Sequence, residues 1–395
     1  MPFLVVWFLL HAYVGVRVVP ALADWPTLAF ALAAALVASA VLVPVGFARR
    51  RAPGVLAWAG LVCMGLFSSL FVLALLRDAG LVAAWTLARA FPALPGWLRL
   101  SGSDVSLASA VAVPAGGALV TAWGFANARR TARVVSVDIP IERLPAALDG
   151  FTIAQISDVH VGTTIRRPYV QAIVEAVNGL DADLVAVTGD LVDGSVPELR
   201  EHVAPLARLA SRHGTFFVTG NHEYYSGAHA WVAELRRLGV RVLMNEHVVL
   251  RRGDAALVLA GVADWSAHHF DPAHRSSPRD AIAGAPADAA ARVLLAHQPR
   301  SAQAAAAAGF DLQLSGHTHG GQFLPWPWFV RLQQPFVAGL HRLGRLWVYT
   351  SRGTGYWGPP KRFGAPSEIT RIRLVRAAAP SDPVDAPSDG ARTRA

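Results

Sequence analysis

The chain has 395 residues, of which 53% are hydrophobic and 16% are charged. This composition excludes a disordered protein and carries less charge than the roughly 25% of an ordinary soluble one. Residues 1–133 hold +7 of the net charge of +9, so the later part lacks the basic excess of a nucleic-acid-binding domain, and no nucleic-acid partner is expected. The single cysteine, Cys63, excludes an intramolecular disulfide and a thiolate metal site.

Residues 1–130 are predicted to form a helical transmembrane domain of about four spans. Four apolar runs are long enough to cross the hydrocarbon core of a bilayer, and they cover residues 3–22, 28–47, 55–76 and 105–126. The segment 81–100 carries Arg89, two prolines and two tryptophans. That pattern favours a helix and loop lying at the membrane surface over a fifth span.

Arginines near the ends of these runs predict the orientation of the protein. Those between the second and third runs, or after the fourth, are Arg49, Arg50, Arg51, Arg129, Arg130 and Arg133. With four spans they share one side, which the positive-inside rule assigns to the cytoplasm. We therefore expect the N-terminus and the C-terminal region to be cytoplasmic. If residues 105–126 do not span the membrane, or residues 81–100 do, the C-terminal region lies outside instead.

From Asp149 onward, short apolar runs alternate with amphipathic stretches, which is typical of an α/β fold. Helices are predicted over 169–180 and 197–211. Strands are predicted over residues 151–157, 183–188, 215–219, 256–261, 292–296, 311–315, 346–350 and 369–374. We predict one catalytic domain over 149–376, followed by a disordered tail over 377–395, which is small, polar and proline-bearing.

Five of the predicted strands run directly into Asp, Asn or His. In chain order the motifs are Asp158-Val159-His160, Gly189-Asp190-Leu191-Val192-Asp193, Gly220-Asn221-His222-Glu223, His297 and Gly316-His317-Thr318-His319. Open α/β sheets build their sites at the carboxyl ends of strands. Carboxylate, carboxamide and imidazole ligands suit a pair of divalent ions such as Mn²⁺, Fe or Zn²⁺.

The ordered set D-x-H, G-D-x-x-D, G-N-H-E, H and G-H-x-H resembles the calcineurin-like metallophosphoesterase superfamily over residues 151–374. The longer strings SGHTHGGQ (315–322) and SRGTGYWGPPKRFGAPSEIT (351–370) are similar to its bacterial membrane-associated branch. That branch includes phosphodiesterases and enzymes that split UDP-2,3-diacylglucosamine. The resemblance implies a four-layer α/β/β/α sandwich with two mixed sheets, attached to the bacterial inner membrane.

The resemblance also implies a role for each site residue. The implied metal ligands are Asp158, His160 and His319 for one ion and Asn221, His297 and His317 for the other, with Asp190 bridging the two. His222 would protonate the departing oxygen and Asp193 would orient it, unless Asp193 is a turn or helix-capping residue. Glu223 is interpreted as a structural carboxylate. The alternative for His297 is a buried strand-end histidine, and its rivals as a ligand are His268, His269 and His274.

These features predict a membrane-anchored hydrolase in which a hydroxide activated by two metal ions attacks a phosphodiester or pyrophosphate. A lipid-linked substrate such as UDP-2,3-diacylglucosamine is one candidate. The alternatives are a phosphomonoesterase or protein phosphatase with the same metals, and a membrane transporter or sensor with a phosphoesterase-like binding module. The aromatic stretch 323–340 fits either a membrane-facing wall or a proline-stiffened loop. Lys361 and Arg362 fit either a phosphate contact or a solvated basic turn.

Overall fold

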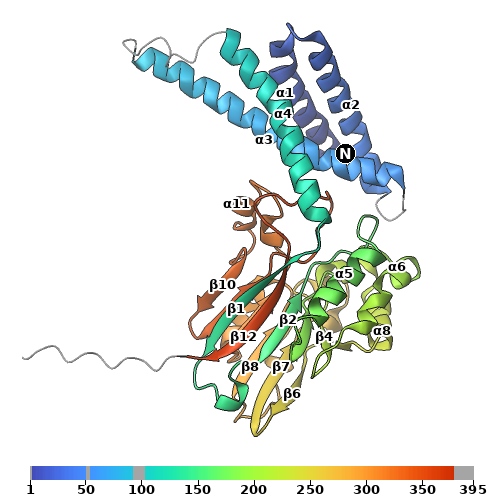
Figure 1. The fold of residues 1–395 in the computed structure, drawn as a ribbon, viewed down its shortest axis with the longest axis vertical. Coiled ribbons are helices and arrows are strands. Elements are labelled where there is room, and N and C mark those ends of the chain that lie inside the picture. The colour runs from blue at the N-terminus through green and yellow to red at the C-terminus, as the bar shows by residue number, and fades with distance from the viewer. Residues whose placement is uncertain (1, 50–53, 92–102, 378–395) are drawn as a thin grey trace, which may run out of the picture.

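The computed structural model describes residues 2–49, 54–91 and 103–377. Long helices gather at one end of the molecule and two β-sheets at the other (Figure 1). The last long helix, α4 (Ser103–Arg129), runs almost directly into the first strand, β1 (Arg133–Ile141), and so joins the two parts.

Four helices are long and apolar enough to cross a membrane, as predicted. They are α1 (Pro2–Val18), α2 (Pro26–Ala48), α3 (Val55–Ala90) and α4. The start of α1 and the ends of α2 and α4 all point toward the sheets (Figure 1). The two groups of loop arginines therefore fall at the same end of the helices, although Arg50 and Arg51 themselves lie outside the described residues.

The helix α3 corrects the prediction for residues 81–100. It has 36 residues, or roughly 54 Å at 1.5 Å per residue, which exceeds the thickness of a hydrocarbon core. Residues 81–90 continue this helix without a break because the first proline after residue 55 is Pro92. The separate surface helix expected there is wrong for 81–90, and 92–100 lie outside the described residues.

Each of the two sheets has six strands, and both are mixed. The first has the order β1-β12-β2-β3-β4-β5, in which β12 pairs antiparallel with β2 and the other pairs are parallel. The second has the order β10-β11-β9-β8-β7-β6, with antiparallel pairs at its two ends. The remaining strands are β2 (Thr152–Ile156), β3 (Leu184–Val187), β4 (Thr215–Phe217), β5 (Arg241–Val242), β6 (Glu246–Arg252), β7 (Ala255–Gly261), β8 (Ala291–Leu295), β9 (Leu312–Ser315), β10 (Gly339–Leu343), β11 (Leu346–Thr350) and β12 (Glu368–Arg376).

The sheets pack face to face, with helices outside, which confirms the predicted four layers. Ile153 and Leu184 of the first sheet meet Leu295 and Leu314 of the second in a fully buried core. The helices α5 (Arg167–Asn178), α6 (Val196–Val203) and α8 (Ala228–Arg237) cover the outer face of the first sheet. The shorter helices α9 (Pro278–Ala281) and α10 (Ala302–Ala307) cover that of the second.

The strands that the sequence pattern did not predict are β1, β5, β6 and β10, which are the four edges of the two sheets. Edge strands bury less side-chain surface, so their apolar pattern is weaker. The strand β1 pairs with β12 from Arg133 to Ile141, so the first sheet includes residues ahead of 149. The predicted helix 197–211 stops at Val203 and continues as a 3-10 helix over Ala204–Arg208, because Pro205 has no N–H group to donate to the α-helical hydrogen-bond pattern. The tail beyond 377 lies outside the described residues.

Candidate active site

All seven predicted metal ligands converge at one edge of the sandwich. Asp158 and His160 follow β2, Asp190 follows β3, and Asn221 begins α7 (Asn221–Ser226) after β4. The second sheet contributes the other three ligands: His297 after β8, and His317 and His319 after β9. Five of them, with other side chains, line a pocket of about 300 Å³, whose lining residues are His160, Asp190, Asn221, His222, Tyr225, His317, His319 and Trp357.

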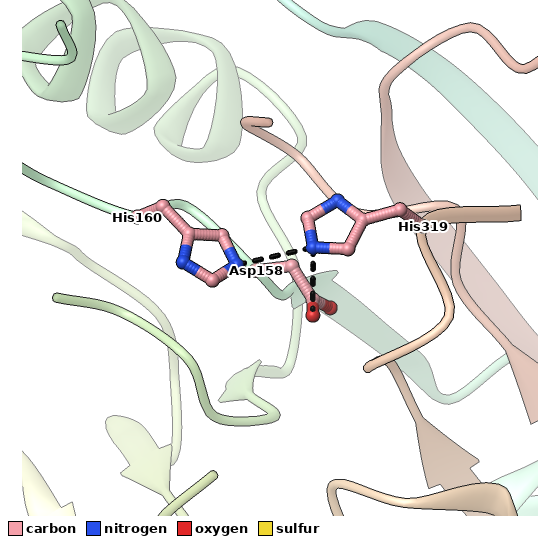
Figure 2. Close-up of side chains that lie close together, drawn as sticks. All are labelled: Asp158, His160 and His319. Carbon is pink, nitrogen blue, oxygen red and sulfur yellow. Dashed lines mark hydrogen bonds and ion pairs between the residues drawn. The ribbon is translucent and has the colours of Figure 1, made fainter. Parts of the chain in front are cut away.

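The first group of ligand atoms comprises Asp158, His160 and His319 (Figure 2). His160 Nε2 lies 3.0 Å from His319 Nε2, which in turn lies 3.5 Å from Asp158 Oδ1. The three side chains come from two different sheets and point at one another. This is the trio that the sequence motifs assign to one ion.

The second group comprises Asp190, His297 and His317. His297 Nε2 lies 3.1 Å from Asp190 Oδ2 and 3.3 Å from His317 Nδ1. The same Asp190 oxygen lies 3.9 Å from His160 Nε2, which places this carboxylate between the two groups. Asn221 Oδ1 is buried without a hydrogen-bond partner among the described residues. A buried acceptor of this kind is costly unless a cation or donor meets it, so the donor set fits metal ions.

The backbone at these positions is strained. Five of the seven candidate ligands have positive φ, between 50° and 70°, a region that non-glycine residues rarely occupy: Asp158, His160, Asp190, His317 and His319. Each such residue costs on the order of 1–3 kcal/mol. A Cβ atom at Gly220 would lie 2.2 Å from Asp190 Oδ1, and one at Gly316 would lie 2.1 Å from Asp158 Oδ2. Only glycine lets these turns approach the carboxylates so closely.

Electrostatics in the pocket also favour cations. Burial lowers the pKa of His317 to about 3 and that of His319 well below its ordinary value, so both rings are neutral and keep a lone pair. Burial disfavours a charged His297 as well, but the Asp190 and Asp158 carboxylates outweigh it and raise the pKa of His297 well above its ordinary value. These carboxylates therefore stabilise positive charge where an ion would be held.

His222 and Asp193 lie side by side at the pocket. His222 Nδ1 donates to Asp193 Oδ1 at 2.5 Å, and the same oxygen lies 3.2 Å from His160 Nδ1. Burial lowers the pKa of His222, but Asp190 and Asp193 together raise it to about 9, which favours imidazolium. The helix after Asp193 is capped instead by Ser195 in a capping box with Glu198.

Glu223 is fully buried and ties the ligand loops together. Its carboxylate accepts hydrogen bonds from the backbone N–H groups of Asp190 (2.9 Å), Leu191 (2.8 Å) and Gly220 (2.6 Å). The loop after β3 is thereby fixed to the start of α7, as the structural interpretation of this residue predicts.

Arg362 contacts a candidate metal ligand, a role that the sequence analysis missed. Its side chain is 1% exposed, which makes the solvated basic turn wrong for this residue. Its Nη2 lies 3.1 Å from His319 Nδ1, and its Nη1 donates to the His319 carbonyl at 2.9 Å and to the Arg352 carbonyl at 2.8 Å. Arg362 thus holds both the backbone and the ring of His319.

Lys361 points the other way, into the membrane helices. Its side chain is also 1% exposed, and its Nζ donates to the Gly65 carbonyl at 2.8 Å and to Ser69 Oγ, both in α3. The backbone N–H of Arg362 donates to the Gly124 carbonyl of α4 at 2.9 Å. A Cβ at Gly124 would lie 2.7 Å from Lys361 Cγ, so a small residue in α4 permits this contact. In the sequence, the glycines and serines within the apolar runs are the feature that could have indicated this contact between the helices and the loop of Lys361.

The aromatic stretch 323–340 lies next to α3. Trp326 Nε1 donates to Ser68 Oγ at 3.1 Å, and the short helix α11 (Pro327–Val330) is at the end of the sheets nearest the long helices (Figure 1). Five large apolar side chains of this stretch are exposed: Leu324, Trp326, Trp328, Phe329 and Leu332. This arrangement favours the membrane-facing interpretation, because exposed aromatic side chains suit headgroup depth.

Comparison with known proteins agrees with this geometry. The sequence profile described as calcineurin-like phosphoesterase matches residues 151–321. A transmembrane protein with metallophosphoesterase domain from Bos taurus is 38% identical over 331 residues, which cover 80% of this chain and 73% of the bovine protein. The Danio rerio protein of the same name is 38% identical over 268 residues, 66% of this chain and 61% of its own length. An uncharacterized metallophosphoesterase from Helicobacter pylori is 37% identical over 257 residues, 64% of this chain and 66% of its own length.

Proposed function

The chain belongs to the calcineurin-like metallophosphoesterases, and we propose that this hydrolase cleaves a phosphodiester or pyrophosphate bond in a lipid-linked substrate at the membrane surface. One observation carries the proposal: a single loop joins the pocket to the membrane helices. Trp357 lines the pocket, and Lys361, four positions later, bonds to α3. A substrate that is confined to the bilayer would thus reach the pocket without leaving the bilayer.

The ligands of the proposed dimetal centre are those that the motifs predict: Asp158, His160 and His319 for one ion, Asn221, His297 and His317 for the other, and Asp190 between them. When bound, two divalent ions of Mn, Fe or Zn supply charge neutralisation at the phosphoryl group and lower the pKa of water. The neutral rings of His317 and His319 need not lose a proton to bind such ions.

The remaining steps belong to side chains of the chain itself. His222 holds a proton on its imidazole and faces the pocket, so it would donate that proton to the departing oxygen. Asp193 accepts from Nδ1 of His222 and so directs Nε2 toward the pocket. Because Asp193 also bonds to His160, one carboxylate sets the position of the acid relative to a metal ligand.

Exposed aromatic side chains support a lipid-linked substrate such as UDP-2,3-diacylglucosamine. Trp357 is 45% exposed beside His222, with ring centroids 5.7 Å apart. Trp328 and Phe329 of α11 are also exposed, and the neighbouring Trp326 donates a hydrogen bond to Ser68 of α3. A nucleotide or headgroup phosphate would enter the pocket while acyl chains stay in the bilayer.

We also propose that the catalytic domain is cytoplasmic and that the helices lie in the inner membrane of a bacterium. Four spans put both ends of the helical domain on one side (Figure 1). Arg49, Arg129 and Arg130 lie at the catalytic end. At the opposite end of the helices, Arg17 forms an ion pair with Asp78 at 2.7 Å. The Asp78 carboxylate offsets the positive charge of this arginine.

The test is hydrolysis by full-length protein in lipid nanodiscs with added Mn²⁺. UDP-2,3-diacylglucosamine is compared with its deacylated nucleotide sugar, and bis-p-nitrophenyl phosphate with p-nitrophenyl phosphate. We expect kcat/KM to favour the acylated compound by tenfold or more, and the diester over the monoester. Preference for the monoester would overturn the proposed bond type and support a phosphomonoesterase. Equal rates on both nucleotide sugars would overturn the lipid-linked substrate.

A further inference from the structure

A second group of metal-binding side chains lies outside the pocket. His229 is in the first turn of α8, Asp271 precedes the 3-10 helix η6 (Pro272–His274), and His274 ends it. His229 Nε2 lies 3.1 Å from Asp271 Oδ2, and His274 Nε2 lies 3.7 Å from the same oxygen. All three ligand atoms lie within 4.8 Å of one another.

Each contributing group is oriented by a further contact. Asp271 Oδ1 accepts from the backbone N–H of Ala273 at 2.9 Å, which leaves Oδ2 to face the two imidazoles. His274 Nδ1 lies 2.9 Å from the hydroxyl of Tyr224, which leaves Nε2 to face the carboxylate. Metal-binding histidines are typically held in this way through the nitrogen that does not bind the ion.

We propose that His229 Nε2, Asp271 Oδ2 and His274 Nε2 form a third divalent-cation site, with Zn²⁺ as its preferred ion and water completing the coordination. Two imidazoles and one carboxylate are a common zinc ligand set, and Mg²⁺ or Ca²⁺ would prefer oxygen alone. Ligands about 2.0–2.2 Å from a tetrahedral ion lie roughly 3.3–3.6 Å apart, so small shifts from the present spacing would suffice.

The site would act on the rim of the catalytic pocket. Phe270, next to Asp271, packs on Tyr224 and Tyr225 with ring centroids 5.7 Å and 5.6 Å apart. Tyr225 lines the pocket and packs on His222 at 5.2 Å. An ion that joins η6 to α8 would therefore clamp the segment that holds these aromatic rings in place, and its role would be structural.

Zinc content and thermal stability of the full-length protein in detergent test this site. Wild type, His229→Ala and His269→Ala are compared after chelation, saturation with Mn²⁺ and dialysis against low Zn²⁺. His229 has a side chain that is 75% exposed, so its replacement should not impair folding. His269 is a nearby exposed histidine outside the cluster and serves as the control.

We expect wild type and His269→Ala to hold one more zinc ion per chain than His229→Ala, and zinc to raise their Tm by about 3 °C more. Asp271→Asn should show the same loss as His229→Ala, because its amide oxygen can still accept from Ala273. Repeating the count in an Asp190→Asn background separates this site from the proposed dimetal centre. Equal zinc content and equal Tm in all variants would show that the cluster is only an Asp–His ion pair. This result would overturn the proposal.

Discussion

Asp193 accepts a hydrogen bond from His222 at 2.5 Å, and with the same oxygen it contacts His160 at 3.2 Å. The proposed acid and a proposed metal ligand are therefore positioned by one atom. Because the carboxylate helps to raise the pKa of His222 to about 9, it also sets the pH range in which that ring carries a proton.

Replacing Asp193 by Asn should shift the pH dependence of hydrolysis. An acid with a raised pKa is protonated below that pKa and is lost as pH rises through it, so the alkaline limb of kcat reports His222. Without the Asp193 charge the pKa of His222 falls, and the alkaline limb should move to lower pH. The kcat–pH profile with bis-p-nitrophenyl phosphate and Mn²⁺ measures this. An unmoved limb in Asp193→Asn, as expected for the exposed-carboxylate control Asp138→Asn, would remove His222 as the titrating acid.

Replacing Asp190 by Asn should abolish turnover and leave the fold intact. Loss of a carboxylate between the two ligand groups removes several kcal/mol of transition-state stabilisation, which corresponds to a loss of about 10³-fold or more. Asn tolerates the left-handed conformation that Asp190 adopts at φ 50°. Activity and thermal unfolding are measured together. Activity close to wild type in a normally folded variant would contradict the dimetal mechanism.

Replacing Arg362 by Lys should weaken metal binding. A lysine has a single ammonium group in place of the branched guanidinium, so it cannot contact His319 Nδ1 and two carbonyl oxygens at once. Loss of such an orienting contact typically costs 10–100-fold in metal affinity or activity. Isothermal titration with Mn²⁺ measures the affinity, with Arg371→Lys on β12 as the control. An unchanged affinity in a folded Arg362→Lys variant would mean that His319 is positioned without it.

Introducing a side chain at Gly124 should disturb the catalytic site from within a membrane helix. A Cβ there would lie 2.7 Å from Lys361 Cγ, so Gly124→Leu should displace the loop that carries Arg362. Misplacement of this order can cost about 10²-fold in rate. Gly80 in α3 has open space around its Cβ position, so Gly80→Leu is the matched control. Equal kcat in the two variants, measured in nanodiscs, would show that the helices only anchor the enzyme.

A reporter fused to Ala395 tests the orientation. Fluorescent protein at this position should be bright and alkaline phosphatase should be inactive, because a cytoplasmic C-terminus suits only the former. A shift of the active reporter to the periplasm would reverse the proposed orientation and place the pocket outside.

The central strands and the clustering of the site could be predicted from local signals, whereas the four layers were implied by the family resemblance. Most central strands are short segments rich in apolar residues, and the candidate ligands stand directly after them, as in Asp158 after β2 and His317 after β9. Three of the edge strands escaped detection because they are polar or short: β6 has the sequence EHVVLRR, β10 has the sequence GLHRL, and β5 has two residues. The contacts of Lys361 and Arg362 could not be predicted, since they join Lys361 to a position 296 residues away and Arg362 to one 43 residues away, and they follow no periodicity.

The position of β12 governs when this enzyme can become active during its synthesis. Residues 368–376 insert between β1 and β2, so the first sheet stays divided until this strand has left the ribosome. By then the four long helices have already been synthesised, since they precede β1 in the chain. A nascent chain that stalls before residue 368 would lack the strand that joins β1 to β2 and would be an inactive precursor.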